Sequence, residues 1–434
     1  MRIKFLDQNI DNSQLILFRI LFGFLLAWQA VLHIAEGWVY QNFIAPKFTF
    51  SHIGMEWLQP LPGNGMYVYF VVLALLGVLI MVGYQYRLSM ILYTLLWAGI
   101  YFMQKTSYNN HYYLLILISG IMCVLPANAY ASADSKLHPE IKRKTMPAWC
   151  RFVVVLQIGI VYFYASVAKL YPDWLNGTFT GGILKKAAKT YGIHFFREKW
   201  MHIFIAYAGI AFDLLIVPAL LYKKTRPWAL AAAIIFHLFN SFTLHIGIFP
   251  YLSLAMLVFF FPAEKITKWF FPKKNVTVTK AESTVVSRKW LWIFVPYFVF
   301  QVFMPLRHHI IKGDVMWTEE GHRLSWRMML RKRRGYAQFK VFDKKTQKSW
   351  VYDLDDVLTP AQRRGIATKP DMLWQMAQYI HTEYAEKGVD VAVYITAKTS
   401  INKAIPHLLI DPKIDMAAAE WNYFSHNDWI LLYK

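Results

Sequence analysis

The stretch CRFVVVLQIGIVYFYASVAKLYPDWLN, residues 150–176, decides how the rest of the chain is organised. No charged residue occurs from Phe152 to Ala168, which is typical of a membrane-spanning helix, and Lys169 follows just before a Tyr-Pro-Asp-Trp turn. A lysine in this position either extends its amine to the membrane surface or serves a functional site. For one segment alone the first explanation is the more common. If Lys169 serves a functional site, burial favours the uncharged amine that a general base requires.

The composition extends the membrane interpretation to most of the chain. Hydrophobic residues make up 56% and aromatic residues 17% of the 434 positions, which is too apolar for an ordinary soluble protein. The formal net charge of +21 is carried largely by short loops between apolar segments, so it indicates membrane orientation and not binding to nucleic acid. The two cysteines, Cys123 and Cys150, provide no disulfide framework and no cysteine-based metal site.

Nine apolar segments predict about nine transmembrane helices. They occupy residues 15–35, 66–83, 88–104, 112–127, 150–169, 200–222, 227–244, 246–262 and 289–306. Some are shorter than the roughly 20 residues that an upright span needs. Basic residues in alternate loops place the N-terminus in the cytoplasm and the C-terminal part outside the cell membrane. One loop, residues 170–199, is basic and departs from this pattern.

The sequence changes character after Pro305. Alternating apolar and polar residues predict strands at 336–342, 349–354 and 390–397 and in the closing DWILLY motif, with a helix near 369–387. About 128 residues are enough for a small domain with its own core. We therefore predict a transmembrane domain, residues 1–306, followed by a β-rich extracytoplasmic domain, residues 307–434.

In this topology four polar segments lie at the same depth, near the outer surface of the membrane. They are KTSYNNH (105–111), Lys169, FHLFNSFTLHIGIFPY (236–251) and WTEEGHRLSWRMML (317–330). Each has an ordinary explanation: asparagines cap helices, His237 fits a core histidine, and the last segment fits a basic interfacial belt. Polar groups are costly in lipid, so their convergence indicates a functional site. His237 and His245 are eight residues apart, and no His-x-x-His or His-x-x-x-His pair exists, so we expect no metal.

Together with FRILFGFL (18–25) and DPKIDMAAAEW (411–421), these segments resemble the vitamin K-dependent gamma-glutamyl carboxylase family and its shorter bacterial relatives, the HTTM-domain proteins. The similarity covers nearly the whole chain in the same order. It implies a multi-pass enzyme of the bacterial inner membrane. Such an enzyme oxidises vitamin K hydroquinone with O2 to the epoxide and couples this oxidation to the addition of CO2 to the gamma carbon of a glutamate in a protein or peptide.

The resemblance also assigns roles to residues. The family's catalytic lysine corresponds to Lys169, which would deprotonate the hydroquinone. The family's Asn-His pair near the quinone corresponds to Asn110 and His111, with His111 also taking part in catalysis. His237 and Asn240 are expected in the same cofactor site. The candidates for binding the glutamate substrate are Trp317, His322, Trp326 and Arg331, of which His322 and Arg331 differ in type from the residues of the animal enzyme.

The resemblance has limits that keep other functions open. The animal enzyme is longer, and its extra C-terminal region has no counterpart here, so recognition of a propeptide is not implied. Quinol oxidation is therefore better supported than carboxylation of a protein. The alternative is a non-catalytic quinone- or lipid-binding membrane protein that retains the fold. A transporter is disfavoured, because the sequence lacks internal repeats and paired broken helices.

Overall fold

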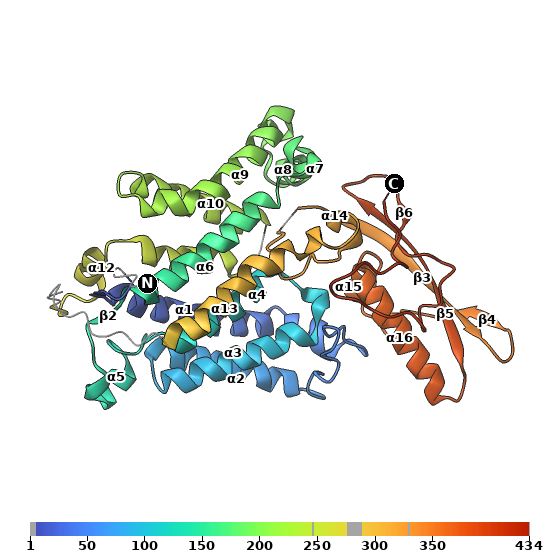
Figure 1. Ribbon diagram of the computed structural model, residues 1–434, viewed down its shortest axis with the longest axis horizontal. Helices are drawn as coiled ribbons and strands as arrows, with labels where there is room; N and C mark the ends of the chain where they lie inside the picture. Colours follow the sequence, from blue (N-terminus) through green and yellow to red (C-terminus); the bar gives the residue numbers. More distant parts are fainter. Residues whose placement is uncertain (1–5, 245–246, 276–288, 329, 434) are drawn as a thin grey trace.

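The computed structural model describes residues 6–244, 247–275, 289–328 and 330–433. The chain forms two parts, a long helical bundle and a smaller sheet-containing unit at one end of it (Figure 1). The N-terminal region lies at the end of the bundle away from the sheet unit, and the C-terminus lies in the sheet unit. The molecule therefore has two ends of different structure.

Each predicted apolar segment contains a helix. The helices are α1 (Ser13–Ala35), α2 (Gly65–Val82), α3 (Tyr86–Met103), α4 (Asn110–Val124), α6 (Ala148–Val167), α9 (Lys199–Leu221), α10 (Arg226–Leu244), α11 (Phe249–Met256) and α13 (Lys289–Phe303). Shorter helices connect them: α5 (Ala133–Leu137), α7 (Pro172–Leu175), α8 (Thr178–Tyr191) and α12 (Ala263–Phe270). The basic loop 170–199 thus contains an extra helix, α8.

The prediction of nine spans is not confirmed. Among the described residues, five helices are long and apolar enough to cross a membrane: α1, α2, α6, α9 and α13 with its extension to His309. A sixth span results if α11 to Phe260 and α12, which bend by 111°, count as one. The 15 residues of α4 reach only about 22 Å at 1.5 Å per residue, too little for an upright span. The fold is that of a membrane protein with fewer full-length spans than predicted.

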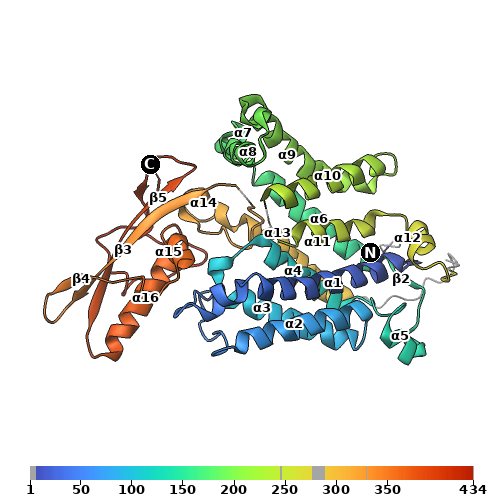
Figure 2. The same cartoon turned by 180° about the vertical axis from the view of Figure 1, so that it is seen from behind.

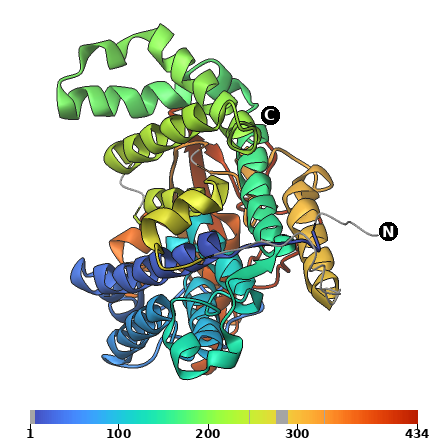
Figure 3. The ribbon, with the colours of Figure 1, turned by 90° about the vertical axis from the view of Figure 1, so that its left-hand side faces the viewer.

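Helix α6 occupies a central position in the bundle. It begins after Pro147 and ends at Val167. The extended backbone of Pro147 prevents the helix from starting earlier in the chain. Figure 3 shows α6 between the α9–α10 pair and the group formed by α1, α2 and α3. Tyr171 has an extended backbone because Pro172 follows it, and this turns the chain away from the α6 axis. Lys169 is therefore held in a turn between two helices.

The end of the bundle far from the sheet unit is closed by a small ladder and a buried lysine. Strand β1 (Asn9–Asp11) pairs antiparallel with β2 (Thr145–Pro147). Lys274, after α12, places its Nζ 2.5 Å from Asp11, 2.7 Å from Asn12 and 2.6 Å from Ser13. This lysine ties the C-terminal side of α12 to the start of α1.

The sheet unit contains four antiparallel strands in the order β4-β3-β5-β6. They are β3 (Arg333–Asp343), β4 (Ser349–Val351), β5 (Val391–Ile401) and β6 (His407–Leu408), accompanied by α14 (Val315–Thr318), α15 (Pro360–Ile366) and α16 (Pro370–Glu386). Figure 2 shows α16 lying along the sheet, and Met376 and Ile380 of α16 share a buried core with Val393 and Ile395 of β5. The prediction of a strand at the DWILLY motif is wrong. This segment forms one isolated antiparallel bridge, between Ile430 and Ile410, which follows β6.

The loop between α1 and α2 joins the two parts. Phe50 is fully buried in the core of the sheet unit. Gln362 donates to the carbonyl of Phe48 at 2.7 Å, and Gln375 donates to that of Ser51 at 3.0 Å. The sheet unit is thus fixed to the bundle by a loop as well as by the chain that follows α13.

Candidate functional site

The predicted catalytic lysine forms a buried ion pair. Lys169 Nζ contacts Oδ2 of Asp213 on α9 and donates to the carbonyl of Ala165 at 3.0 Å. Lys169 is 8% exposed and Asp213 is 5% exposed. The indole of Trp174 lies 5.3 Å from Nζ, measured to the ring centroid. The amine therefore has a proton acceptor in direct contact and little access to water.

A second polar contact lies two turns earlier on α6. The Tyr162 hydroxyl and Nε2 of His237 on α10 are 2.8 Å apart. His237 is 1% exposed, and within the described part of the chain its buried Nδ1 has no hydrogen-bond partner. The ring of Phe212, which precedes Asp213, lies 6.1 Å from the ring of Tyr162 and 6.2 Å from that of His237. Helix α9 therefore carries both the partner of Lys169 and an aromatic neighbour of His237.

Phe249 at the start of α11 contacts both predicted cofactor histidines. Its ring stacks on the imidazole of His111 at 3.8 Å and lies edge-on to His237 at 6.1 Å. No hydrogen bond joins Lys169 to His111 among the described residues. The structure thus brings His111 and His237 together, whereas Lys169 is connected to them through its neighbours on α6 and α9.

The other two predicted cofactor residues are placed differently. Asn240 is half-buried, three residues beyond His237 on α10. Asn110 accepts a hydrogen bond from the Tyr108 hydroxyl at 3.1 Å and donates to the carbonyl of Arg327 at 3.3 Å. Asn110 therefore holds the segment after α14, while His111 beside it contacts Phe249. His245 lies outside the described residues.

Two of the predicted substrate residues anchor the segment that follows α14. Trp317 donates from its indole to the carbonyl of Leu431 in the sheet unit at 2.7 Å. Trp326 is 1% exposed and packs 5.1 Å from the ring of Tyr113 on α4. The segment is therefore attached at one tryptophan to the sheet unit and at the other to the bundle.

The backbone of this segment is strained. Glu319, Leu324 and Trp326 have φ angles of 64°, 60° and 57°, in the left-handed region that residues other than glycine rarely adopt. Such positions cost about 1–3 kcal/mol each and persist only where surrounding contacts impose them. Three of them within eight residues indicate that the segment is held in a specific shape by its contacts.

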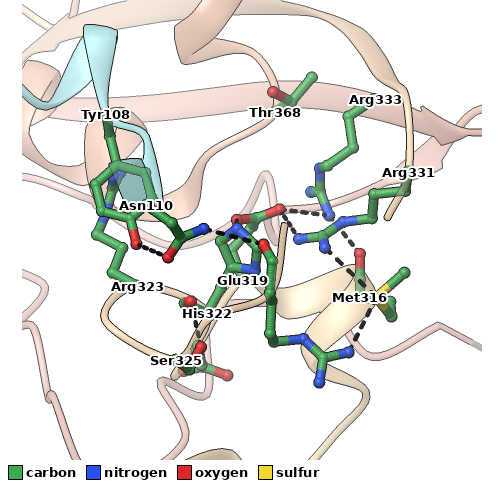
Figure 4. Close-up of polar contacts among 12 residues, drawn as sticks. Tyr108, Asn110, Met316, Glu319, His322, Arg323, Ser325, Arg331, Arg333 and Thr368 are labelled. Carbon is green, nitrogen blue, oxygen red and sulfur yellow. Dashed lines mark hydrogen bonds and ion pairs between the residues drawn. The ribbon is translucent and has the colours of Figure 1, made fainter. Parts of the chain in front are cut away.

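Glu319 lies at the centre of a group of basic side chains (Figure 4). Its carboxylate contacts Nη2 of Arg331, lies 3.3 Å from Nη1 of Arg333 and lies 4.0 Å from Nε2 of His322. Arg333 also donates to the carbonyls of Met316 and Trp317 at 2.7 and 2.8 Å. We call Arg331, Arg333 and His322 the basic cradle.

The basic cradle has more donors than Glu319 can satisfy. Burial alone would raise the pKa of Glu319, but Arg331, His322 and Arg333 hold this pKa well below its usual range. Burial lowers the pKa of Arg333 to about 10, although Glu319 opposes that change. Among the described residues, the N–H donors Nε of Arg331 and Nε and Nη2 of Arg333 are buried without a hydrogen-bond partner. Unsatisfied buried donors are costly, so the cradle suits a further acceptor.

A second group of charges fixes the sheet unit next to the cradle. Lys105 Nζ and Arg323 Nη2 each lie 2.9 Å from Oδ2 of Asp371, at the start of α16. Burial lowers the pKa of Lys105 to about 8, with Asp371 opposing. Burial would raise the pKa of Asp371, but Arg323 and Lys105 hold it well below its usual range. These three residues connect the loop before α4, the segment after α14 and α16.

A cavity of about 980 Å³ lies between the Lys169 turn and the basic cradle. Ala168 and Tyr171 line it beside Lys169, and Met316 and Arg327 line it beside the cradle. Residues of the sheet unit, including Tyr433, complete the wall. The cavity is therefore lined by chain neighbours of the two charged groups and by none of Lys169, Asp213, Glu319 and the cradle residues themselves.

Sequence reasoning missed Asp213, Glu319 and Arg333. Asp213 carried a usable signal, because it is the only acidic residue in α9, and a charge within a span is functional by default. Glu319 and Arg333 lie in a stretch rich in charges, where the sequence alone does not show which acid meets which arginine.

Comparison with known families agrees with this arrangement. The HTTM domain matches residues 7–265, and the lumenal domain of vitamin K-dependent gamma-carboxylase matches residues 286–434. No solved structure matches the chain significantly. The first match includes Lys169, His111 and His237, and the second includes the basic cradle. These domains and the apolar helices indicate a carboxylase-like membrane enzyme. With an HTTM domain followed by the carboxylase lumenal domain, the chain belongs to the vitamin K-dependent gamma-carboxylase family.

Proposed function

We propose that this protein oxidises vitamin K hydroquinone with O2 to the epoxide and couples the oxidation to the carboxylation of a glutamate gamma carbon with CO2. The glutamate belongs to a protein or peptide. The observation that carries the proposal is the buried Lys169–Asp213 pair, which is connected to His237 through Phe212 and Tyr162. Membership of the carboxylase family supports the same reaction.

The residues around His237 suit a hydroquinone. A hydroquinone presents a flat apolar ring system and hydroxyl groups, and the rings of Phe212 and Phe249 lie beside His237. The buried Nδ1 of His237 has no partner in the described part of the chain, and buried polar atoms normally have one. A quinol oxygen is a partner of the right kind. His111, stacked on Phe249, offers a second imidazole, with Asn110 and Asn240 as further cofactor residues.

In this proposal Lys169 is the base that accepts a proton from a quinol hydroxyl. Its Nζ must first be uncharged, and Oδ2 of Asp213 is the contacting group that takes the proton from Nζ. Scarce water favours an uncharged pair over two separated charges. His111 and His237 stabilise negative charge at the quinol oxygen by hydrogen bonding. When bound, the hydroquinone supplies with O2 the strong base that removes the glutamate gamma proton, and exclusion of water protects that base.

The glutamate substrate would enter through the cavity at the junction of the two parts. Arg331 and Arg333 offer charge-assisted hydrogen bonds to a carboxylate, and His322 lies beside them. Trp317 and Trp326 hold the segment that carries these residues. In the proposed topology, residues 1–306 form the domain in a bacterial inner membrane with the N-terminus in the cytoplasm, and residues 307–434 lie outside.

The test compares two buried lysines that each pair with an aspartate. Purified protein is incubated with vitamin K hydroquinone in air, and the epoxide is measured by chromatography. Lys169→Ala is expected to reduce epoxide formation by about 100-fold or more, the usual contribution of a general base. Lys274→Ala breaks the Lys274–Asp11 contact at the far end of the bundle. Its epoxide formation per amount of folded protein is expected to equal that of wild type.

Equal epoxide formation by wild type and Lys169→Ala would refute the role of Lys169. A wild-type protein that binds the quinol but forms neither epoxide nor carboxyglutamate would refute the enzyme proposal. That result would instead favour a quinone- or lipid-binding protein that retains the fold.

A further inference from the structure

The basic cradle already holds a carboxylate of the same kind as the substrate group it is proposed to bind. The side chain of Glu319 ends in the carboxylate that Arg331 and Arg333 contact, and a glutamate substrate ends in an identical group. The two carboxylates cannot occupy the same donors at once. A substrate carboxylate that takes the donors now facing Glu319, Nη2 of Arg331 and Nη1 of Arg333, must therefore displace Glu319.

Glu319 has a left-handed backbone at the end of α14, and its side chain contacts the cradle. Glu319 has a φ angle of 64° at the end of α14, which has only four residues. Gly321, two residues later, also has a positive φ of 75°. The backbone of Glu319 is bonded on both sides, its N–H to the carbonyl of Val315 at 3.2 Å and its carbonyl to the N–H of His322 at 3.1 Å, while its carboxylate contacts the cradle.

Met316 contacts both the cavity and an arginine of the cradle. Met316 lines the cavity, and its Sδ lies 3.4 Å from Nη1 of Arg331 and 3.2 Å from Nη2 of Arg327. Methionine has three rotatable bonds and adapts its shape easily. Met316 is therefore a side chain whose rotation would bring Arg331 closer to the cavity.

We propose that Glu319 is an internal competitor that occupies the carboxylate position of the basic cradle until the glutamate of a peptide substrate displaces it. This inference rests on the proposed function, since it takes Arg331 and Arg333 as the substrate-binding residues. The chain's own carboxylate keeps the buried arginines neutralised when no substrate is bound, since an unpaired buried charge is strongly unfavourable. Glu319 thereby lowers the apparent affinity for every carboxylate ligand, and a neutral side chain in its place raises that affinity.

Glu320 provides a matched control in the same turn. It is also a buried glutamate, 4% exposed, but its carboxylate contacts Nδ1 of His426 at 2.7 Å and accepts hydrogen bonds from Asn427 at 2.8 Å. These partners belong to the sheet unit and not to the cradle. Glu319→Gln and Glu320→Gln therefore remove the same charge from neighbouring positions with different surroundings.

The experiment measures binding of the peptide acetyl-Ala-Ala-Glu-Ala-Ala-amide to the full-length protein by calorimetry, without quinol. The same peptide with glutamine in place of glutamate is the ligand control. Glu319→Gln is expected to bind the glutamate peptide about tenfold or more tightly than wild type, by removal of the competitor. It should show no gain for the glutamine peptide, and Glu320→Gln should bind the glutamate peptide as wild type does.

Thermal unfolding gives a second measurement on the same samples. Glu319→Gln is expected to have a lower Tm than wild type in the absence of peptide, and the glutamate peptide should raise its Tm more than it raises that of wild type. A folded Glu319→Gln protein that binds the glutamate peptide no better than wild type would overturn the inference.

The two proposals fail in different ways. If no variant binds the peptide but the wild type still forms epoxide, the inference is wrong and quinol oxidation stands. If Glu319→Gln gains affinity but no epoxide forms, the competitor role stands and the proposed oxidation is wrong.

Discussion

The two buried charged groups of the candidate site are built in different ways. Lys169 and Asp213 form a closed pair of one cation and one anion, each buried and in direct contact with the other. The basic cradle gathers Arg331, Arg333 and His322 around the single carboxylate of Glu319 and leaves several buried donors without partners in the described residues. A closed pair can exchange a proton within itself. A group of two arginines around one carboxylate can exchange that carboxylate for another. Buried charges therefore suit proton transfer in the Lys169–Asp213 pair and carboxylate binding in the basic cradle.

The largest effect is expected from breaking the closed pair. Asp213→Ala leaves the Lys169 amine buried without a counter-charge, and we expect a loss of about 3–5 kcal/mol in the free energy of unfolding. Lys169→Met combined with Asp213→Leu should recover most of that stability, because no buried charge remains, while forming no epoxide. Denaturant unfolding in detergent measures the first effect and the epoxide assay the second. Unchanged stability of Asp213→Ala would show that the pair contributes nothing.

A smaller effect is expected from removing one arginine of the cradle. In Arg331→Met, Glu319 keeps its contact with Arg333, so we expect a loss of about 1.5–3 kcal/mol, typical of a hydrogen bond to a charged group. The KM for a glutamate peptide should rise, with little change in kcat for epoxide formation. Arg363→Met is the control, since Arg363 pairs with Asp355 on the surface, where both side chains are more than half exposed. Equal effects of the two substitutions would contradict a special role of the cradle.

The pH dependence of stability distinguishes the cradle from a set of surface charges. The folded-state pKa of Glu319 is lowered below its ordinary value of 4.5, so its stabilising contribution is complete above that value and is lost as the pH falls below it. Asp371 acts in the same direction, because its pKa is also lowered. We expect the Tm of wild type to fall between about pH 5 and pH 3. The fall should be shallower in Glu319→Gln, and parallel curves for the two proteins would contradict this assignment.

The smallest effect concerns the hydrogen bonds that hold the cradle segment to the bundle. The Tyr108 hydroxyl donates to Asn110 and accepts from the backbone N–H of Leu324 at 2.9 Å. Tyr108→Phe removes both bonds, and we expect a loss of about 1 kcal/mol in unfolding free energy. Tyr336→Phe, at an exposed position of β3, should leave the stability unchanged. A Tyr108→Phe protein as stable as wild type would show that the segment is held by its tryptophans alone.

The positions of the helices could be predicted because apolar runs are a local property of the sequence. The number of spans could not, since it depends on helix length and on bends such as the one between Phe260 and Ala263. In the sheet unit, alternation predicted the strands at 336–342, 349–354 and 390–397. Alternation wrongly predicted a strand in the DWILLY motif, where only Ile430 pairs, with Ile410. How many residues of two distant segments pair depends on the tertiary fold and not on alternation.

Parts of the site were visible in the sequence for a similar reason. Lys169 and His237 stood out as polar residues in apolar surroundings. Their partners Asp213 and Tyr162 come from the packing of α6 against α9 and α10, which no spacing along the chain determines. The contact of Glu319 with Arg331 depends on a left-handed backbone at Glu319, and nothing in the residue type indicates that conformation.

Asn110 and His111 contact different groups although one peptide bond joins them. Asn110 is bonded to the carbonyl of Arg327 in the segment that carries the cradle, and His111 stacks on Phe249 next to His237. The first turn of α4 therefore contacts the cradle segment through Asn110 and the His237 region through His111. The start of this short helix is a mechanical link between the region that would receive a peptide and the region that would receive a quinol.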